Sequence, residues 1–372
     1  MMILIKNARL YSPYEMGIKD ILVAGTKIEA IKDKIDVGAL DIDIIDAQGE
    51  MVHPGLIDPH VHAIGGGGEA GMLSRVPPLQ ERKIAESGVT SLVGLLGTDG
   101  YTRGVKELVA KIKGFKEWGL SAWALTGSYQ VPSITITGSV GDDITFIDEI
   151  IGVKVAVADH RCSFPTTEEL IRLASEVRIA SLVANKAGVV HFHVGASDLG
   201  ISQLFEIVDR THMPIRHLFP THMGGHMDMA KRWLEKGGNV DITCHSDADE
   251  KAASLLELYP DRVTLSTDSN GSFPKWNDDK SAIIGMGAGS IAELKNYLDK
   301  LLASGLDKTL ALKAVTENSA KAMGFKSKGK IEVGMDADIV IRDGSDIRYV
   351  IANGSYLVKE RVAKRSMYDD IC

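Results

Sequence analysis

The sequence has few cysteines, no long apolar run and no block of like charge. Its three cysteines are widely spaced in 372 residues, so we expect no disulfide framework. No apolar segment has membrane-spanning length, and the N-terminus lacks the pattern of a signal peptide. The 42 Lys and Arg against 50 Asp and Glu give a net charge of −8 without a basic cluster, which argues against nucleic acid as a partner. We therefore expect a soluble, reduced, cytoplasmic protein.

Both ends of the chain consist of short strand-like runs separated by turn residues. Residues 2–7 form one such run near the N-terminus, and residues 329–332 form another near the C-terminus. In the middle of the chain, apolar strands alternate with segments of helical periodicity. The pattern predicts a small β-sandwich-like domain built from residues 1–52 and 329–372, and an α/β domain over residues 53–328.

The α/β part contains eight apolar runs of strand length, most of them followed by a helix-like segment. Near-continuous apolar strands are typical of a parallel sheet that is covered on both faces. Eight such β/α units predict a (β/α)8 TIM barrel. A doubly wound sheet is the structural alternative, but no Gly-x-Gly-x-x-Gly follows an early strand. The predicted strands cover residues 55–62, 89–97, 121–127, 152–158, 189–194, 216–222, 239–244 and 262–267.

Polar residues stand at the ends of several predicted strands. His60 and His62 end the first strand at positions i and i+2, so both imidazoles point to the same side. His222 ends the sixth strand, and Asp268 follows the eighth. TIM barrels assemble their active sites at this end of the strands. Imidazoles and carboxylates that converge there predict a metal site.

Polar residues also lie within strands that are otherwise apolar. Lys154 interrupts the fourth strand, where burial of a charged ammonium is costly. An ion pair is the structural explanation. The functional explanation is a lysine carbamylated by CO2, because its carboxylate could bridge two divalent cations. Of His191 and His193 on the fifth strand, His193 lies nearer the strand end and is the expected ligand.

Four consecutive glycines, residues 65–68, follow the first strand and precede Glu69. The Lys-Ser/Thr pair of a phosphate-binding loop is missing after them. We therefore expect a loop that contacts substrate, exposes backbone N–H groups and presents the Glu69 carboxylate.

These motifs together resemble those of the amidohydrolase superfamily, and the segment Ala337-Asp338-Ile339-Val340 near the C-terminus adds to the resemblance. Further segments narrow it to the isoaspartyl (β-aspartyl) dipeptidases, and the glycine run with Glu69 is specific to that group. The similarity runs along nearly the whole chain. The segments that carry it are residues 52–71, 94–99, 126–129, 135–140, 151–161 and 265–272.

The resemblance implies a binuclear zinc centre and a set of substrate contacts. The implied metal ligands are His60 and His62 for the first zinc, His193 and His222 for the second, carbamylated Lys154 as the bridge and Asp268 completing the first site. The implied substrate contacts are Glu69 with the backbone of Gly67 and Gly68 for the free α-amino group, Thr98 for the aspartyl α-carboxylate, Tyr129 for the scissile carbonyl, and Arg161 and Ser272 for the other carboxylate or for orienting the peptide.

One position departs from the family pattern. The family carries an arginine three residues after the sixth-strand histidine, where it helps to hold the leaving residue's carboxylate, but this chain has Gly225. The missing guanidinium removes a charged hydrogen bond worth about 1.5–3 kcal/mol. His226 could replace it in part, and the acidic residues 246–250 could favour a different or cationic leaving group.

The resemblance implies hydrolysis of β-aspartyl dipeptides, in which a metal-bridging hydroxide attacks the side-chain amide carbonyl and Asp268 transfers the proton. One alternative is an amidohydrolase acting on a cyclic amide, of the dihydroorotase or hydantoinase type, or on a different N-acyl amino acid. Another is a non-enzymatic scaffold of the same fold, although every ligand position is filled. We expect a small dipeptide substrate, no nucleic acid or membrane partner, and a homo-oligomer.

Overall fold

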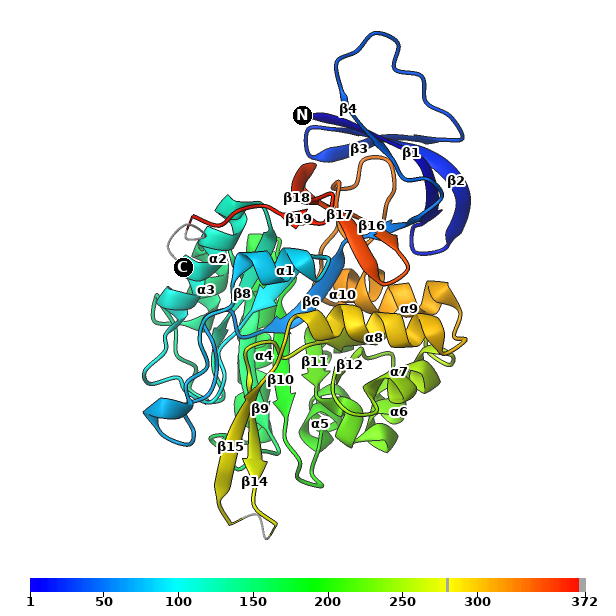
Figure 1. Cartoon of the computed structure of the whole chain (residues 1–372). Coiled ribbons are helices and arrows are strands. Elements are labelled where there is room, and N and C mark those ends of the chain that lie inside the picture. Colours follow the sequence, from blue (N-terminus) through cyan, green and yellow to red (C-terminus); the bar gives the residue numbers. More distant parts are fainter. Residues whose placement is uncertain (279–280, 368–372) are drawn as a thin grey trace.

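The computed structural model describes residues 1–278 and 281–367 (Figure 1). Its two largest hydrophobic cores are separate. One lies in a sheet built from both chain ends, and the other fills the α/β middle of the chain and extends to C-terminal residues such as Val340 and Val350. In Figure 1 the sheet of the chain ends stands above the α/β part. Among the described residues, no helix combines the length and the apolar character needed to cross a membrane.

The two chain ends share one nine-stranded sheet within the described residues. Strand β5 joins them, because it pairs in parallel with β1 and antiparallel with β16. The predicted strand at residues 329–332 is wrong, since the Ile331 N–H and C=O both hydrogen-bond the Ser12 hydroxyl, at 3.0 and 2.7 Å, instead of a neighbouring strand. The sheet consists of β1 (Met2–Tyr11), β2 (Glu15–Ala24), β3 (Lys27–Lys32), β4 (Asp43–Asp46), β5 (Met51–Pro54), β16 (Ile339–Asp343), β17 (Asp346–Ala352), β18 (Ser355–Lys359) and β19 (Val362–Ala363).

All eight strands predicted in the middle of the chain are present. Six form one parallel sheet in which every strand lies beside its neighbour in sequence, so the strand order shows none of the reversal of a doubly wound fold. The remaining two, β12 and β13, form a parallel pair. The eight strands are β6 (Leu56–Val61), β7 (Val89–Gly94), β8 (Ser121–Gly127), β9 (Ile150–Val157), β10 (Val189–Val194), β11 (Leu218–Thr221), β12 (Val240–Thr243) and β13 (Val263–Ser266).

The backbone ladders of the described strands do not close into a complete ring. At both interruptions, however, buried carboxylates bridge the neighbouring strands. Between β11 and β12, the Thr221 hydroxyl donates to Asp241 at 2.6 Å. Between β6 and the end of β13, the Thr267 hydroxyl donates to Asp58 at 2.5 Å. The protein therefore has an α/β fold with a curled parallel sheet, whose strands surround a common interior.

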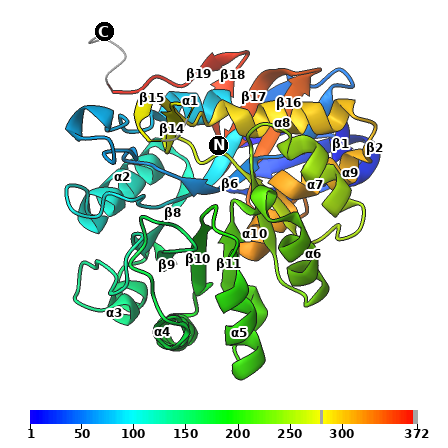
Figure 2. The same ribbon diagram turned by 90° about the horizontal axis from the view of Figure 1, so that it is seen from below.

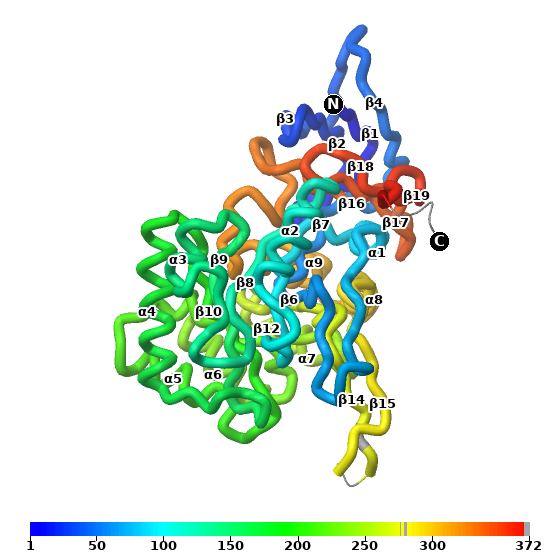
Figure 3. Tube along the Cα trace, turned by 90° about the vertical axis from the view of Figure 1, so that its left-hand side faces the viewer, coloured from blue at the N-terminus to red at the C-terminus, as the bar shows by residue number. Residues whose placement is uncertain are grey.

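Helices cover the outside of this curled sheet, as Figure 2 shows from below. Helix α4 begins with a capping box, in which Thr166 and Glu169 satisfy each other's backbone N–H groups. After β13 the chain forms an antiparallel hairpin that projects beyond the sheet (Figure 3), made of β14 (Ser272–Trp276) and β15 (Ile283–Ala288). The helices are α1 (Glu81–Glu86), α2 (Val105–Trp118), α3 (Val140–Phe146), α4 (Thr167–Ala184), α5 (Ser202–Arg210), α6 (Met227–Glu235), α7 (Ala248–Leu256), α8 (Ala292–Ala303), α9 (Lys308–Val315) and α10 (Glu317–Ala322), with single 3-10 turns at Met72–Ser74, Ile215–His217 and Met223–Gly225.

Candidate active site

Side chains from three strand ends converge at one end of the curled sheet. The Nε2 atoms of His60 and His62, on and just after β6, lie 3.2 and 2.9 Å from Asp268 Oδ1, which follows β13. His222, directly after β11, brings its ring centroid to 5.1 Å from that of His60. Ligand atoms of His60, His222 and Asp268 all lie within 4.8 Å of one another. This group of two histidines and one carboxylate fits a metal site.

The local backbone is shaped to hold these groups. His222 and Asp268 both adopt left-handed conformations, with φ of 63° and 50°. Such conformations cost a non-glycine residue about 1–2 kcal/mol, and they concentrate at functional sites. Gly97, after β7, also makes room, since a Cβ there would come within 2.9 Å of the His62 ring. The fold thus tolerates unfavourable backbone conformations at the positions that bring these side chains together.

Among these histidines, His60 and His222 each have a ring nitrogen without a hydrogen-bond partner among the described residues. His222 Nδ1 lies 2.6 Å from the Thr243 hydroxyl, which leaves Nε2 buried without a partner among the described residues. A hydrogen bond to the other ring nitrogen is the usual way in which proteins orient a metal-binding histidine. Burial, with the nearby charge of Lys154, lowers the pKa of His60 to about 3. His60 is therefore neutral at physiological pH, as a ligand must be.

Lys154 lies on β9 in the interior of the sheet and is fully buried. Its Nζ atom has no hydrogen-bond partner among the described residues, so the structural explanation of a direct ion pair does not apply. Burial lowers the pKa of Lys154 to about 7. A buried amine that is partly neutral at pH 7 is the form that reacts with CO2. The unpartnered atom thus fits a bridging carbamate beside the histidines and Asp268.

His193, on β10, has both ring nitrogens engaged. Nδ1 lies 2.8 Å from the Tyr129 hydroxyl, and Nε2 lies 2.9 Å from Asp159 Oδ2. Its ring centroid is 4.6 Å from that of His222, so the two predicted ligands of the second ion are neighbours. The other histidine of this strand, His191, is fully buried with two unpartnered nitrogens among the described residues. His191 is absent from the wall of the pocket described next.

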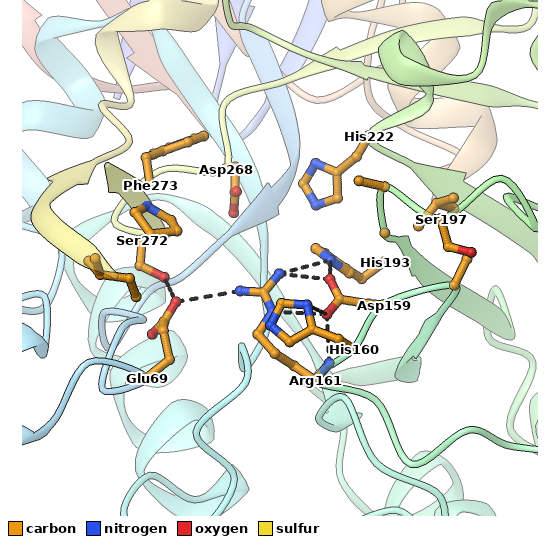
Figure 4. A pocket seen from close by; sticks show the side chains of 16 residues that line it. Glu69, Asp159, His160, Arg161, His193, Ser197, His222, Asp268, Ser272 and Phe273 are labelled. Atoms are coloured by element: carbon orange, nitrogen blue, oxygen red, sulfur yellow. Dashed lines mark hydrogen bonds and ion pairs between the residues drawn. The ribbon is translucent and has the colours of Figure 1, made fainter. Parts of the chain in front are cut away.

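A pocket of about 590 Å3 opens above these residues. Figure 4 shows Glu69 and Ser272 on the left of the pocket, Asp268 and His222 at the top, and Arg161 to the right of Glu69, beside Asp159 and His193. The Ser272 hydroxyl donates to Glu69 Oε1, and Arg161 Nη1 lies 3.5 Å from the same oxygen. Glu69 and Arg161 thus present opposite charges within one cavity, as recognition of a zwitterionic ligand requires.

Asp159 fixes the position of Arg161. Its carboxylate accepts hydrogen bonds from Arg161 Nε and Nη2, at 2.9 and 2.7 Å. Burial opposes ionisation of Asp159, but these bonds and the one from His193 outweigh it and hold the pKa of the carboxyl well below its usual range. Asp159 therefore connects the substrate side of the pocket to a predicted metal ligand.

The glycine loop packs against Ser74, and the predicted contact of its Gly67 and Gly68 backbone with the substrate's amino group stays a prediction. Gly67 has φ of +78°, and a Cβ there would come within 2.3 Å of the Ser74 carbonyl oxygen, so only glycine fits. The Gly68 N–H donates to the Ser74 hydroxyl at 3.1 Å instead of pointing freely into the pocket. Thr98 follows β7 and is not among the described residues that line the pocket. Its predicted role as a carboxylate ligand stays a prediction.

Sequence reasoning missed four residues that support the site. Asp159 and Thr243 hydrogen-bond predicted metal ligands, while Asp58 and Asp241 lie beneath the site with pKa values that burial raises to about 7 and about 6. The signal for Asp159 is its place directly after the fourth predicted strand. The expected partial substitute for the missing arginine, His226, instead places Nε2 2.8 Å from the Gly195 carbonyl oxygen.

Solved structures similar to this chain include those of β-aspartyl dipeptidases. A crystal structure of the Fervidobacterium islandicum AW-1 enzyme in complex with a β-Asp-Leu dipeptide is 38% identical, with a TM-score of 0.94, and the match covers 99% of this chain and 100% of that one. A second crystal structure of β-aspartyl dipeptidase from the same organism is 37% identical, with a TM-score of 0.91. These matches confirm the resemblance to isoaspartyl dipeptidases.

Curated relatives match at lower identity. An adenine deaminase of Thermosipho africanus is 24% identical over 96% of this chain, which spans only 59% of the deaminase. A deacetylase of Agrobacterium fabrum is 26% identical over 90% of this chain and 81% of its own length. The model of the amidohydrolase family matches residues 51–367. This chain therefore belongs to the amidohydrolase family of hydrolases.

Proposed function

We propose that this protein is a binuclear zinc-dependent hydrolase of β-aspartyl dipeptides. The observation that carries the proposal is the shared pocket, in which Glu69 and Arg161 face the group formed by His222 and Asp268. A β-aspartyl dipeptide carries a free amine and a carboxylate next to the amide to be cleaved. The bound β-Asp-Leu dipeptide in the similar Fervidobacterium structure supports this substrate class. We further propose that the eight strands form a TIM barrel within residues 53–328, and that residues 1–52 and 329–372 form a separate domain.

We assign the metal ligands as the sequence predicted them. His60, His62 and Asp268 would hold one zinc, His193 and His222 would hold the other, and carbamylated Lys154 would supply a carboxylate ligand to both. The unpartnered buried atoms Lys154 Nζ and His222 Nε2 support this assignment. When bound, the ions lower the pKa of water and polarise the substrate carbonyl.

The pocket residues bind and orient the dipeptide. The Glu69 carboxylate receives the α-amino group, while Arg161, held by Asp159, attracts a carboxylate. Ser272 fixes Glu69 through its hydroxyl. The Tyr129 hydroxyl, 2.8 Å from His193, donates to the scissile carbonyl oxygen as negative charge develops there. Burial raises the pKa of Tyr129 far above its ordinary value, so its hydroxyl keeps its proton.

Asp268 moves the proton that hydrolysis requires. Burial opposes its ionisation, but the contacts with His60 and His62 outweigh burial and hold its pKa well below the usual range. The carboxylate is therefore available to accept a proton from the attacking water. It then donates that proton to the leaving nitrogen as the amide C–N bond breaks, which releases aspartate and a free amino acid.

A substrate panel tests this proposal. Zinc-loaded protein should hydrolyse β-Asp-Leu and leave α-Asp-Leu, dihydroorotate and N-acetyl-leucine intact. Asp268→Ala should retain its circular dichroism spectrum while turnover falls by about 10³-fold or more, because the proton relay is lost. Metal content near two ions per chain is expected for the wild type. Preferential cleavage of the cyclic amide, or unchanged activity of Asp268→Ala, contradicts the proposal.

A further inference from the structure

A second pocket adjoins the first at the far side of His222. Its volume is about 270 Å3, and it shares His222 and Phe273 with the larger pocket. The shared residues place it next to the predicted site of bond cleavage. Pockets that take drug-sized ligands measure about 300–1,000 Å3. The second pocket is below that range, which fits a single amino-acid residue better than a longer peptide.

The walls of the second pocket combine apolar and charged groups. Ile242 is buried, and Phe273 stacks on His245 with ring centroids 5.6 Å apart. The charged groups are Lys251 on α7 and Asp247, which directly precedes this helix. Lys251 Nζ lies 2.8 Å from Asp247 Oδ1. An ammonium has three donors, so the bond to Asp247 leaves donors free for a ligand. The pocket thus offers an apolar surface and one ion pair, whose ammonium keeps donors free.

Gly224 and Gly225, which also line this pocket, leave space beside the Lys251 side chain. A Cβ on Gly224 would lie 3.8 Å from Lys251 Cδ, so the lysine stem runs beside Gly224. A Cβ on Gly225 would meet nothing within 4 Å, and this glycine has no positive φ. The position therefore faces open space, which a longer side chain could occupy. In this chain the only lysine or arginine among the described residues that line the pocket is Lys251.

We propose that this pocket binds the leaving residue of the dipeptide, and that Lys251 anchors its carboxylate where Gly225 replaces the family arginine. The inference rests on the proposed β-aspartyl dipeptidase function and assigns a specificity-determining residue to it. Ile242 and Phe273 contact the leaving side chain, so residues such as leucine are preferred. A cationic leaving group gains little here, because the Asp247 carboxylate is already paired with Lys251.

The test compares two substrates that differ only at the carboxylate, β-Asp-Leu and β-Asp-leucinamide. In Lys251→Ala, the kcat/KM for β-Asp-Leu should fall about tenfold or more through a higher KM, because a charged hydrogen bond is lost. The kcat/KM for β-Asp-leucinamide should stay at the wild-type value. Lys251→Arg should keep the preference for the carboxylate. Lys295→Ala is the matched control, since Lys295 also forms an i,i+4 pair, with Asp299 at 3.0 Å, on a helix away from the pocket.

A second variant tests the geometry by rescue. Gly225→Arg combined with Lys251→Ala should restore the preference for β-Asp-Leu, because the open space at Gly225 accepts the longer side chain. Equal loss on both substrates, or no loss on either, overturns the role of Lys251. If the wild type cleaves neither substrate, the proposed function fails. The role of the pocket is then tested separately, by measuring the binding of leucine and leucinamide. Nuclear magnetic resonance titration should then show that the wild type prefers leucine to leucinamide and that Lys251→Ala does not, and absence of that preference overturns the inference.

Discussion

Replacement of Lys154 by methionine tests the most unusual group in the site. Methionine is unbranched and of similar length, so it fills the space of the lysine stem without a polar atom. In protein stripped of metal and CO2, Lys154 Nζ is buried without a partner among the described residues. The variant should therefore be more stable than the wild type at pH 7, although it loses a predicted ligand.

The pKa of Lys154 sets the size of this gain. Burial lowers it from 10.5 to about 7. One pKa unit corresponds to about 1.36 kcal/mol. Burial of this amine therefore lowers the free energy of unfolding of the wild type at pH 7 by about 4 kcal/mol, relative to a side chain that does not ionise. Between pH 7 and 10.5 the unfolded chain binds this proton and the folded chain does not. The stability of the wild type should therefore rise with pH across this window, and the Lys154→Met variant should lack that rise.

Urea denaturation of chelator-treated protein at pH 7 and pH 9, in buffer free of CO2, measures both effects. Lys328→Met provides the matched control. Lys328 is also buried, but it pairs with Asp336 at 3.1 Å and Asp338 at 2.8 Å, so its replacement should destabilise the fold by about 3–5 kcal/mol. Equal stability and equal pH slopes for wild type and Lys154→Met would refute the argument. Full metal occupancy in Lys154→Met would refute the bridging carbamate.

Three further changes probe the neighbours of the site. Thr243→Val removes the hydroxyl that orients His222, so affinity for zinc should fall about 10–100-fold in a chelator competition, and an unchanged affinity would contradict the role. Asp159→Asn weakens the hydrogen bond to His193 and removes the negative charge that holds Arg161 in place. Both the affinity for zinc and kcat/KM should therefore decrease. If only one of them changes, Asp159 does not link the two sides of the pocket. Glu69→Gln should lower kcat/KM for β-Asp-Leu but not for its N-acetylated form, and equal effects on both would remove Glu69 from amine recognition.

The strands of the fold could be predicted because each is a local pattern. Near-continuous apolar runs identified all eight strands of the α/β part, and the spacing of His60 and His62 indicated that both point to one side. The pairing of distant segments has no such local signal. The bond from Thr267 to Asp58 joins residues 209 positions apart, and the sequence contains nothing that specifies it. The failed strand at residues 329–332 has the same cause, since Ser12 from the other chain end takes its hydrogen bonds.

The supporting polar residues beneath the site did leave a signal, in the alternation within two strands. In β12, Asp241 alternates with apolar residues, and in β13 Thr264 and Ser266 do the same. The register pairs Asp241 with Thr264, and both hydroxyls donate to the Asp241 carboxylate, at 2.7 and 2.6 Å. Because alternate residues face one side of a strand, these polar groups share the interior face of the sheet. A carboxylate that accepts such bonds costs less to bury than an isolated one, so it can stabilise positive charge above it. Polar residues at alternate positions in otherwise apolar parallel strands therefore indicate the interior face of a curled sheet that supports an active site, because a hydrophobic core alone does not require them.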